Sequence, residues 1–282
     1  MSLHSPGAIV EPTRTTRDRR APSYPSGDIS SPVPIPLVIA SSNPHKVQEF
    51  RQILAPLAAD FTVLGLADLN TRGAGPFHEP EETGSTFEHN AAIKALSYAA
   101  QTGMNCLADD SGLEIDALGG KPGVISSHYF NDGRTDGPAA TMSRLERDRL
   151  NNHRVLRELS GVPLHRRNAR FVCVIALAAP QRAPVHAAAG APPASLLASF
   201  RATFEGRIGL PASDSPDPAL AVPRGTHGFG YDPLFLVAPD DARTSAELDP
   251  AEKNASSHRA RAAALLLPWL ARHAADLNHP AR

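Results

Sequence analysis

Two adjacent aspartates, Asp109 and Asp110, follow an apolar stretch and precede a serine and a glycine in the segment ADDSG. Neighbouring carboxylates repel one another when both are ionised, and a bound Mg²⁺ would remove that repulsion because it prefers oxygen ligands. One of the two could also accept a proton from an attacking water molecule. The same residues are good turn residues, so from this segment alone a simple turn stays open as the alternative.

A phosphate site is predicted by the segment SSNPHK, which stands between an apolar run and a helical pattern. The start of a helix leaves backbone N–H groups without intrahelical partners and carries partial positive charge, so phosphate fits there. A capped helix with a solvated lysine is the alternative interpretation. The candidate phosphate-binding residues are Ser41, Ser42, Asn43, Pro44, His45 and Lys46.

Acidic side chains gather in the segment EETGSTFEHNAAIKA, residues 81–95. Asn90 and Lys94 are four residues apart, so on a helix they share a face and could point toward one ligand. An acidic helix start favoured by the helix dipole, with a solvated lysine, explains the same residues without a ligand. The candidate ligands for a hard metal ion here are Glu81, Glu82 and Glu88.

An aromatic ring set among glycines is the main feature of GTHGFGYDPLF, residues 225–235. Glycines let the backbone approach a ligand closely, and the ring of Phe229 could stack on a base. The carboxylate of Asp232 could accept hydrogen bonds from ring N–H groups of that base. The alternative is a glycine-rich turn before a strand, with Phe229 packed into the core.

Cationic side chains stand near a predicted helix start in AEKNASSHRARA, residues 251–262, with Ser256 or Ser257 as the cap. Cations at a helix N-terminus oppose its dipole, which favours a bound anion over a merely exposed basic helix start. The donors of this segment are Lys253, His258 and Arg259.

Alternating strands and helices must position these segments, and with an antiparallel pair they predict an α/β or α+β layered fold. The predicted helices are a segment that starts at Pro44, then Thr86–Ala100, Arg144–Leu159, and Arg259–Leu267, which ends before Pro268. The predicted strands are Leu37–Ala40, Phe61–Leu64, Met104–Ala108 ending at the two aspartates, residues 170–178, their hairpin partner 195–209, and Phe235–Val237.

The composition bounds the domain organisation. Residues 1–33 are rich in proline, serine and arginine and predict a disordered tail. Residues 34–275 predict one domain with flexible insertions at about 180–194 and 212–224, followed by a C-terminal tail at 276–282.

The net charge of −1 provides no bulk field for nucleic acid or an anionic membrane. The longest apolar run is too short to span a bilayer, and the two cysteines are expected to be buried hydrophobes in a reducing compartment.

Taken together and in this order, the segments resemble the inosine triphosphate pyrophosphatase family, the Ham1-like non-canonical purine NTP pyrophosphatases. The resemblance covers about residues 35–272 and rests on ASSNPHKVQEF, EETGSTFEHNAAIKA, ADDSGLEIDALGGKPGV, ARFVCVIAL, GFGYDPLF and TSAELDPAEKNASSHRARA. It implies hydrolysis of ITP, dITP and XTP to the monophosphate and pyrophosphate, which cleans the nucleotide pool. It also implies an elongated mixed α/β sheet flanked by helices, two lobes with a central cleft, and a cytoplasmic homodimer.

The resemblance also implies a role for each matched residue. Asp110 would be the catalytic proton acceptor. Donors of His258 or Arg259 aimed at O6 of the base would exclude adenine, because they would be left unpaired. The implied Mg²⁺ ligands are Glu82, Asp109 and Asp110. The implied substrate contacts are residues 41–46 for the phosphates, Lys94 and Ser111, Phe229, Gly230, Tyr231 and Asp232 around the base, and Lys253, His258 and Arg259.

One departure from the family pattern lies in the segment Ser126-Ser127-His128-Tyr129, where the family usually has Ser-Ala-Arg-Tyr. It leaves local phosphate or interface contacts open. Two other functions also remain open: a Maf-like pyrophosphatase for pyrimidine nucleotides, and a nucleotide-binding protein without catalysis.

Overall fold

The computed structural model describes residues 33–181 and 194–278. The predicted N-terminal tail up to residue 32, most of the predicted insertion at 180–194 and the last four residues lie outside these ranges. The chain divides into Met1–Val33 and Pro34–Arg282, and the second unit carries every element described below.

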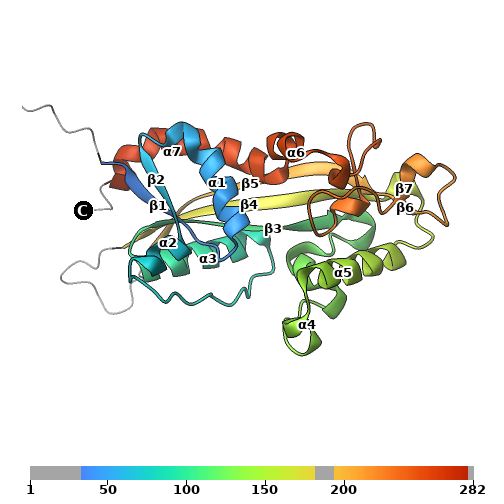
Figure 1. Cartoon of the computed structure of the whole chain (residues 1–282), viewed down its shortest axis with the longest axis horizontal. Helices are drawn as coiled ribbons and strands as arrows, with labels where there is room; N and C mark the ends of the chain where they lie inside the picture. Colours follow the sequence, from blue (N-terminus) through green and yellow to red (C-terminus); the bar gives the residue numbers. More distant parts are fainter. Residues whose placement is uncertain (1–32, 182–193, 279–282) are drawn as a thin grey trace, which may run out of the picture. The chain divides into compact units, whose positions relative to one another are not determined.

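A six-stranded mixed sheet forms the framework of this unit, with strands in the order β2-β1-β3-β4-β5-β8 (Figure 1). β1 is parallel to β2 and β3, and the remaining pairs are antiparallel. A short parallel pair, β6 with β7, lies apart from it. The strands are β1 Ile35–Ile39, β2 Phe61–Gly65, β3 Asn105–Ile115, β4 Asn168–Pro180, β5 Ala194–Ile208, β6 Leu210–Pro211, β7 Ala221–Val222 and β8 Phe235–Val237.

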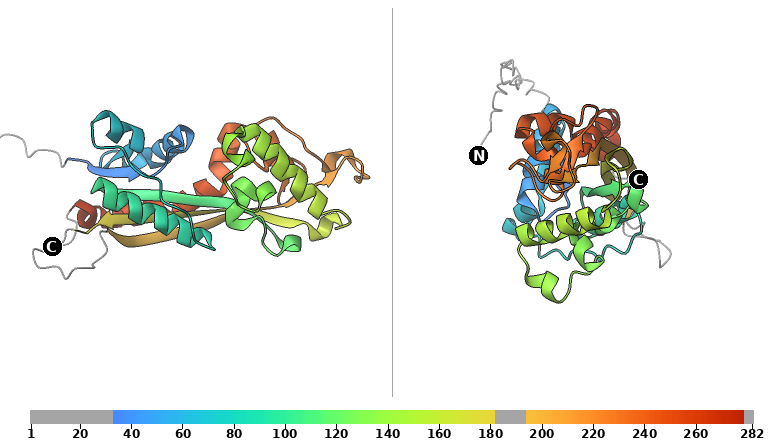
Figure 2. Two further views of the ribbon diagram at one scale, coloured as in Figure 1. Left: turned by 90° about the horizontal axis from the view of Figure 1, so that it is seen from below. Right: turned by 90° about the vertical axis from the view of Figure 1, so that its right-hand side faces the viewer.

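Helices cover both faces of the sheet (Figure 2). They are α1 Pro44–Leu54, α2 Leu66–Thr71, α3 Phe87–Thr102, α4 Pro138–Thr141, α5 Arg144–Glu158, α6 Pro250–Ser256 and α7 His258–Asn278. The predicted α/β class is therefore confirmed, as are the predicted strands near 37, 61, 170, 195 and 235. No helix among the described residues is long and apolar enough to cross a membrane.

Three hydrophobic clusters divide the core. α3 packs on one face of β3 and β4, where small side chains such as Ala91 and Ala95 let the helix approach closely. α1 and α7 pack on the opposite face around Phe50 and Leu266. A third cluster lies farther along the sheet, where α5 and β8 meet around Tyr129. The ends of the sheet thus have separate cores, and the candidate residues lie between them.

The strand that was predicted to end at Ala108 does not end there. β3 runs on to Ile115, and its ladder with β4 pairs Asp109 with Ile175 and Asp110 with Val174. The prediction was wrong because two adjacent charges suggested a turn. Side chains alternate along a strand, so both acids fit inside it when each face supplies its own cations.

The end of the last helix also differs from its prediction. α7 continues through Pro268 to Asn278, although proline cannot donate to the preceding turn. Leu266 and Leu270 on either side of it are fully buried, so packing on the sheet holds the helix together. Part of the stretch 212–224 also belongs to the core, because Val222 of β7 is 3% exposed.

A buried arginine ties the end of α5 to the sheet. Arg167 is 1% exposed and donates to the carbonyl oxygens of Leu159 and Val162, each at 2.8–2.9 Å, and of Gly209 at 2.8 Å. These carbonyls have a charged donor in place of water, so the arginine fixes the position of the chain between α5 and β4.

Replacing Arg167 with methionine removes this donor from three buried acceptors. We expect the free energy of unfolding to fall by about 3 kcal/mol or more, since each unsatisfied buried acceptor is costly. Arg166→Met is the matched control, because Arg166 is exposed. Urea unfolding followed by circular dichroism measures both variants, and equal stability of the two would contradict this role.

Candidate functional site

Asp109 points from β3 toward the face that α1 and α7 cover. Lys46 of α1 donates to both of its carboxylate oxygens, at 2.9 and 3.0 Å, and Arg259 of α7 donates to Oδ2 at 3.1 Å. Arg259 also donates to Glu49 of α1 at 3.0 Å. The two aspartates therefore do not share one direction, and Asp109 is the centre of a buried charge network.

This network holds Asp109 in its ionised form. Burial alone raises the pKa of the carboxyl, but the charges of Lys46 and Arg259 outweigh it and bring the pKa well below its usual value of 3.8. Asp109 was predicted as a metal ligand. Its oxygens instead lie on two protein cations, with which a metal ion would have to compete.

Asp110 points to the opposite face, toward α3. Lys94 donates to its Oδ1 at 3.1 Å and to Oε2 of Glu82 at 3.2 Å. The second oxygen of Asp110, Oδ2, is buried and has no hydrogen-bond partner. Burial and the nearby charge of Glu82 raise the pKa of Asp110, and Lys94 offsets this only in part. Asp110 is therefore the acid with a free oxygen and the greater affinity for a proton.

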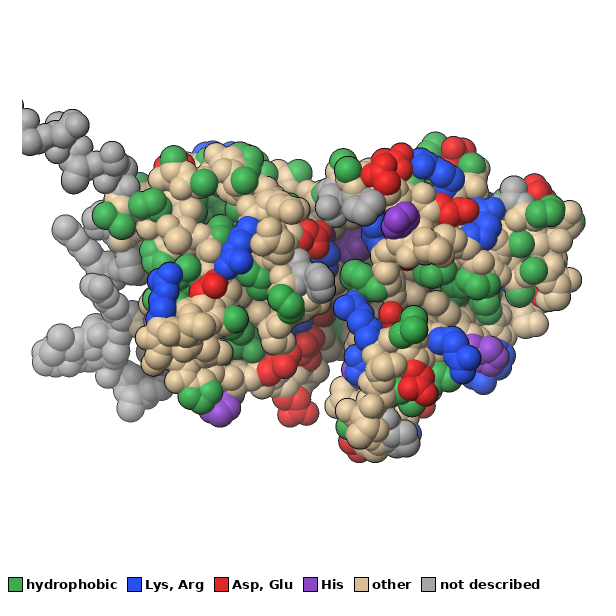
Figure 3. Space-filling model, viewed as in Figure 1, with side chains coloured by type: hydrophobic (Ala, Val, Ile, Leu, Met, Phe, Trp, Pro, Cys, Tyr) green, Lys and Arg blue, Asp and Glu red, His purple; other side chains and the backbone are tan. Residues whose placement is uncertain are grey.

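A cavity of about 670 Å³ joins most of the candidate residues. In Figure 3 the surface is hollowed between the side that carries α1 and α3 and the side that carries α5 and α6. Asp110 itself is 8% exposed and reaches this cavity through Lys94, which donates to it and is a lining residue. The predicted residues that line the cavity are Ser41, Ser42, Asn43, Lys46, Glu82, Lys94, Asp109, Ser111, Phe229, Gly230, Tyr231, Asp232, Lys253, His258 and Arg259.

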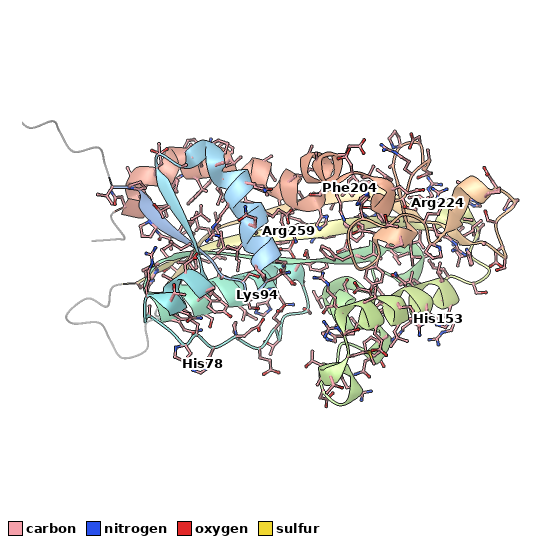
Figure 4. The ribbon with its side chains drawn as sticks, in the orientation of Figure 1. His78, Lys94, His153, Phe204, Arg224 and Arg259 are labelled. Carbon is pink, nitrogen blue, oxygen red and sulfur yellow. The ribbon has the colours of Figure 1, made fainter. Side chains whose placement is uncertain are left out.

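Figure 4 labels Lys94 and Arg259, which come from α3 and α7 and reach adjacent residues of β3 from its two faces. The cavity therefore holds cations from three helices around one pair of acids. This arrangement suits an anionic ligand although the chain as a whole carries almost no net charge.

The predicted phosphate segment lies where β1 leads into α1. Asn43 donates its backbone N–H to Oγ of Ser41 at 3.2 Å, and Pro44 and His45 open the helix. Ser41, Ser42 and Asn43, which precede α1, line the same cavity as Lys46, and their binding of phosphate stays a prediction.

The aromatic loop lies across the cavity from the phosphate segment. Phe229 is 53% exposed, so the interpretation that packs it into the core is wrong. Tyr231 is buried and donates to the carbonyl oxygen of Ser126 at 2.7 Å, which fixes the loop from beneath.

Asp232 has protein partners for both of its oxygens. It accepts from the backbone N–H of Phe229 at 2.8 Å and from Ser245 Oγ at 2.8 Å, and it forms an ion pair with Lys253. Asp232 was predicted to accept from the base. In this structure it shapes the loop that presents Phe229, and Lys253 comes from α6, a helix that the sequence analysis did not predict.

α7 begins at His258, and Ser257 caps it by accepting from the N–H of Ala260 at 3.2 Å. The ring of His258 stacks on Phe171 with centroids 5.3 Å apart, and its Nδ1 is buried without a partner. Burial and the neighbouring charge of Arg259 bring its pKa well below 6.5, so the ring is neutral.

Three of the predicted ligand contacts have other partners. Asn90 accepts from the backbone N–H of Gly84 at 2.8 Å and supports a turn, and Glu88 forms an ion pair with Arg201 at 2.9 Å. Arg259, which was predicted to reach O6 of the base, donates to Asp109 and Glu49 instead. Glu81 is exposed and does not line the cavity.

Several cavity residues come from segments that carried no motif. Asp148 of α5 accepts from the N–H of Gly230 at 2.8 Å, and Asn152 donates to its carbonyl at 3.0 Å. Arg144 and Arg147, also of α5, line the same cavity. Glu49 is the one residue that spacing could have found, because it lies three positions after Lys46 on α1.

The residues present fit a Mg²⁺ ion that binds together with a ligand. Glu82 and Asp110 share Lys94, and the free Oδ2 of Asp110 is an oxygen without a donor. No group of three or more acidic, histidine or cysteine ligands occurs within residues 33–181 and 194–278. Mg²⁺ is commonly held by one or two carboxylates with water and substrate phosphates, so two acids suffice.

Known proteins resemble this chain over most of its length. The model of the Ham1 family matches residues 37–269. The dITP/XTP pyrophosphatase of Geobacter sulfurreducens is 42% identical over 230 residues, which is 82% of this chain and 94% of that protein. That of Frankia alni is 42% identical over 224 residues, 79% of this chain and 91% of that protein.

Solved structures of Ham1 proteins and a dITP/XTP pyrophosphatase are also similar to this chain. A HAM1 protein from Coxiella burnetii has a TM-score of 0.63 at 37% identity, over 84% of this chain and 99% of that one. A nucleoside-triphosphatase, the dITP/XTP pyrophosphatase from Mycobacterium abscessus, has a TM-score of 0.58 at 35% identity, over 83% and 100%.

Replacing each of the two neighbouring aspartates should affect the free energy of unfolding differently. Asp109→Asn leaves Lys46 and Arg259 without their shared partner, so we expect the free energy of unfolding at pH 7 to fall by about 3–5 kcal/mol. Asp110→Asn removes a charge that burial disfavours, so we expect a change of less than about 1 kcal/mol or a gain. Urea unfolding without metal measures both, and equal losses would contradict the division of roles.

The acid dependence of stability should follow Asp109. Its pKa is lower in the folded chain than the usual 3.8, so its contribution is present above that pH and is lost as the pH falls below it. We expect this part of the acid loss to be absent in Asp109→Asn, as measured by urea unfolding across a pH series.

Proposed function

The chain belongs to the Ham1 family, and from this premise we propose that it hydrolyses ITP, dITP and XTP to the monophosphate and pyrophosphate. The relatives named dITP/XTP pyrophosphatase support this activity. We further propose a cytoplasmic homodimer that acts on free nucleotides, without nucleic acid or membrane as partner. These two points rest on the family resemblance, and the near-zero net charge supports the choice of partner.

One observation carries the proposal: Glu82 and Lys94 line a cavity that also holds residues before α1 and an exposed aromatic ring, and Lys94 joins them to Asp110, whose Oδ2 has no partner. A nucleoside triphosphate has a phosphate chain, an accompanying metal ion and a base. The cavity offers cations, paired carboxylates and a stacking surface in the corresponding places. Neither a structural turn nor an ordinary helix cap explains all three features together.

Glu82 and Asp110 would hold the Mg²⁺ ion. When bound, the ion would neutralise the phosphate charge and withdraw electrons from phosphorus. Lys94 donates to both acids and so fixes their positions before any ligand arrives. Asp109 stays with Lys46 and Arg259 and orients the lysine, and its charge is a structural requirement.

Asp110 accepts the proton from the water that attacks the α-phosphorus. The bond from that phosphorus to the oxygen bridging to the β-phosphate breaks, and pyrophosphate leaves. A pKa raised by burial makes Asp110 a better proton acceptor than an ordinary aspartate, while Lys94 engages Oδ1 and leaves Oδ2 without a hydrogen-bond partner.

The remaining residues bind the two ends of the substrate. The N-terminus of α1 with Lys46 holds phosphate oxygens through N–H groups and charge. Phe229 stacks on the base, and His258 lines the same cavity. Gly228 lets the loop pass close to Asp232, since a Cβ at Gly228 would lie 2.2 Å from Asp232 Oδ2.

A nucleotide panel tests the reaction and the base preference. We expect Mg²⁺-dependent release of pyrophosphate from ITP, dITP and XTP, with little from dTTP or UTP. Asp110→Asn should lower kcat by at least about 100-fold, because the proton acceptor is lost. Preference for a pyrimidine would support the Maf-like alternative, and tight ITP binding without turnover would support a binding protein.

Two neighbouring glutamates test the metal site. Glu82→Gln should raise the Mg²⁺ concentration for half-maximal rate by about tenfold or more, because it removes one of two carboxylates. Glu81→Gln is the matched control, since Glu81 is exposed and outside the cavity. A Mg²⁺ titration of the ITP rate measures both, and equal midpoints would exclude Glu82 as a ligand.

A further inference from the structure

The guanidinium group of Arg144 covers the ring of Phe229. Its central carbon lies 4.0 Å from the ring centroid, which is a stacking distance. Arg144 is the first residue of α5, directly after the cap Ser143. No local pattern connects this helix start with the aromatic loop, which follows 85 positions later along the chain.

Phe229 is the one aromatic side chain among the large hydrophobic residues that are exposed in the described part of the chain. Two cations lie over its ring, the guanidinium of Arg144 and the Nζ of Lys253 at 5.4 Å from the centroid, and only the guanidinium is flat like a base. Arg144 therefore occupies a position at which the base is expected.

The contacts that hold Arg144 in place are weak. Its side chain is 50% exposed, and its ion pair with Asp148 spans 4.0 Å. Asp148 is itself committed to the N–H of Gly230 at 2.8 Å. An exposed pair of this length adds little stability, so the guanidinium can move outward at small cost while Asp148 keeps the loop in place.

Arg144 also lies where the two ends of the site approach each other. It lines the main cavity and an adjoining one of about 400 Å³, together with Asn43, Lys46, Glu49, Phe229 and Arg259. If the side chain of Arg144 moves away from Phe229, it therefore stays beside these two cavities.

We propose that Arg144 is a base-binding residue: the purine enters between Phe229 and Arg144, and the guanidinium covers the outer face of the bound base. This inference rests on the proposed function and adds a residue to its base site. A guanidinium is planar and weakly hydrated, and it stacks on bases as it does on aromatic side chains. The guanidinium of Arg144 therefore stacks on Phe229 before the base binds and on the base afterwards.

The competing assignment is a contact to phosphate, since Arg144 is cationic and lies near Lys46. The two assignments differ in what Arg144 recognises. A base contact affects IMP and ITP and leaves inorganic tripolyphosphate unaffected. A phosphate contact affects tripolyphosphate as well.

The experiment compares Arg144→Ala and Arg144→Lys with Arg149→Ala, an exposed arginine of the same helix outside the cavity. It measures kcat and KM for ITP, and inhibition by IMP and by tripolyphosphate, all with Mg²⁺. We expect Arg144→Ala to raise KM and the IMP inhibition constant by about 3- to 10-fold, from the loss of one cation–π contact. The kcat and tripolyphosphate inhibition should change by less than about twofold, within the scatter of a surface substitution.

Arg144→Lys keeps the positive charge and loses the planar guanidinium. On a logarithmic scale it should therefore restore less than half of the IMP affinity that Arg144→Ala loses. The proposal is overturned by an unchanged KM and IMP constant in Arg144→Ala, by equal weakening of tripolyphosphate, or by full recovery with lysine. A wild-type protein that does not hydrolyse ITP would refute the proposed function instead, and the IMP measurements by direct calorimetry would still decide the role of Arg144.

Discussion

The site depends on the alternation of side chains along β3, which directs two adjacent acids to opposite faces of one sheet. On one face Asp109 meets Lys46 and Arg259, and all three charges are largely withdrawn from water. Buried charges are tolerated only when they are paired, so α1, β3 and α7 depend on one another at this point. The same network holds Lys46 at the cavity, and a structural ion pair therefore positions a residue of the proposed phosphate site.

The opposite face is built with less charge compensation. Asp110 shares a single lysine with Glu82, and one of its oxygens is left without a partner. An unpartnered oxygen in a buried position costs stability and retains affinity for a proton or a cation. The strand thus separates a structural acid from a reactive one, although they are neighbours in the chain.

The sequence predicted much of this arrangement because the relevant signals are local. The run before Pro44 and the helical spacing after it predicted β1 and α1, which flank the predicted phosphate segment. The separate partners of the two aspartates did not follow from the local sequence, because the cations that meet them come from α1, α3 and α7. The contacts of Asp148 with Gly230 were hidden for a related reason, since 82 positions separate them. The continuation of α7 beyond Pro268 was also not predicted, because packing of the helix on the sheet outweighs the missing backbone donor of the proline.

The third hydrophobic cluster supports the aromatic loop through Tyr231, while the first two support the acids and the phosphate segment. With the proposed base site, substitutions around Tyr129, Val155 and Phe235 would alter the support of the aromatic loop through a cluster that shares no residue with the one packed against α3. Base preference and bond cleavage would then be separable traits for natural selection. Descendants of such a scaffold can change the nucleotides they remove and keep the hydrolytic machinery intact.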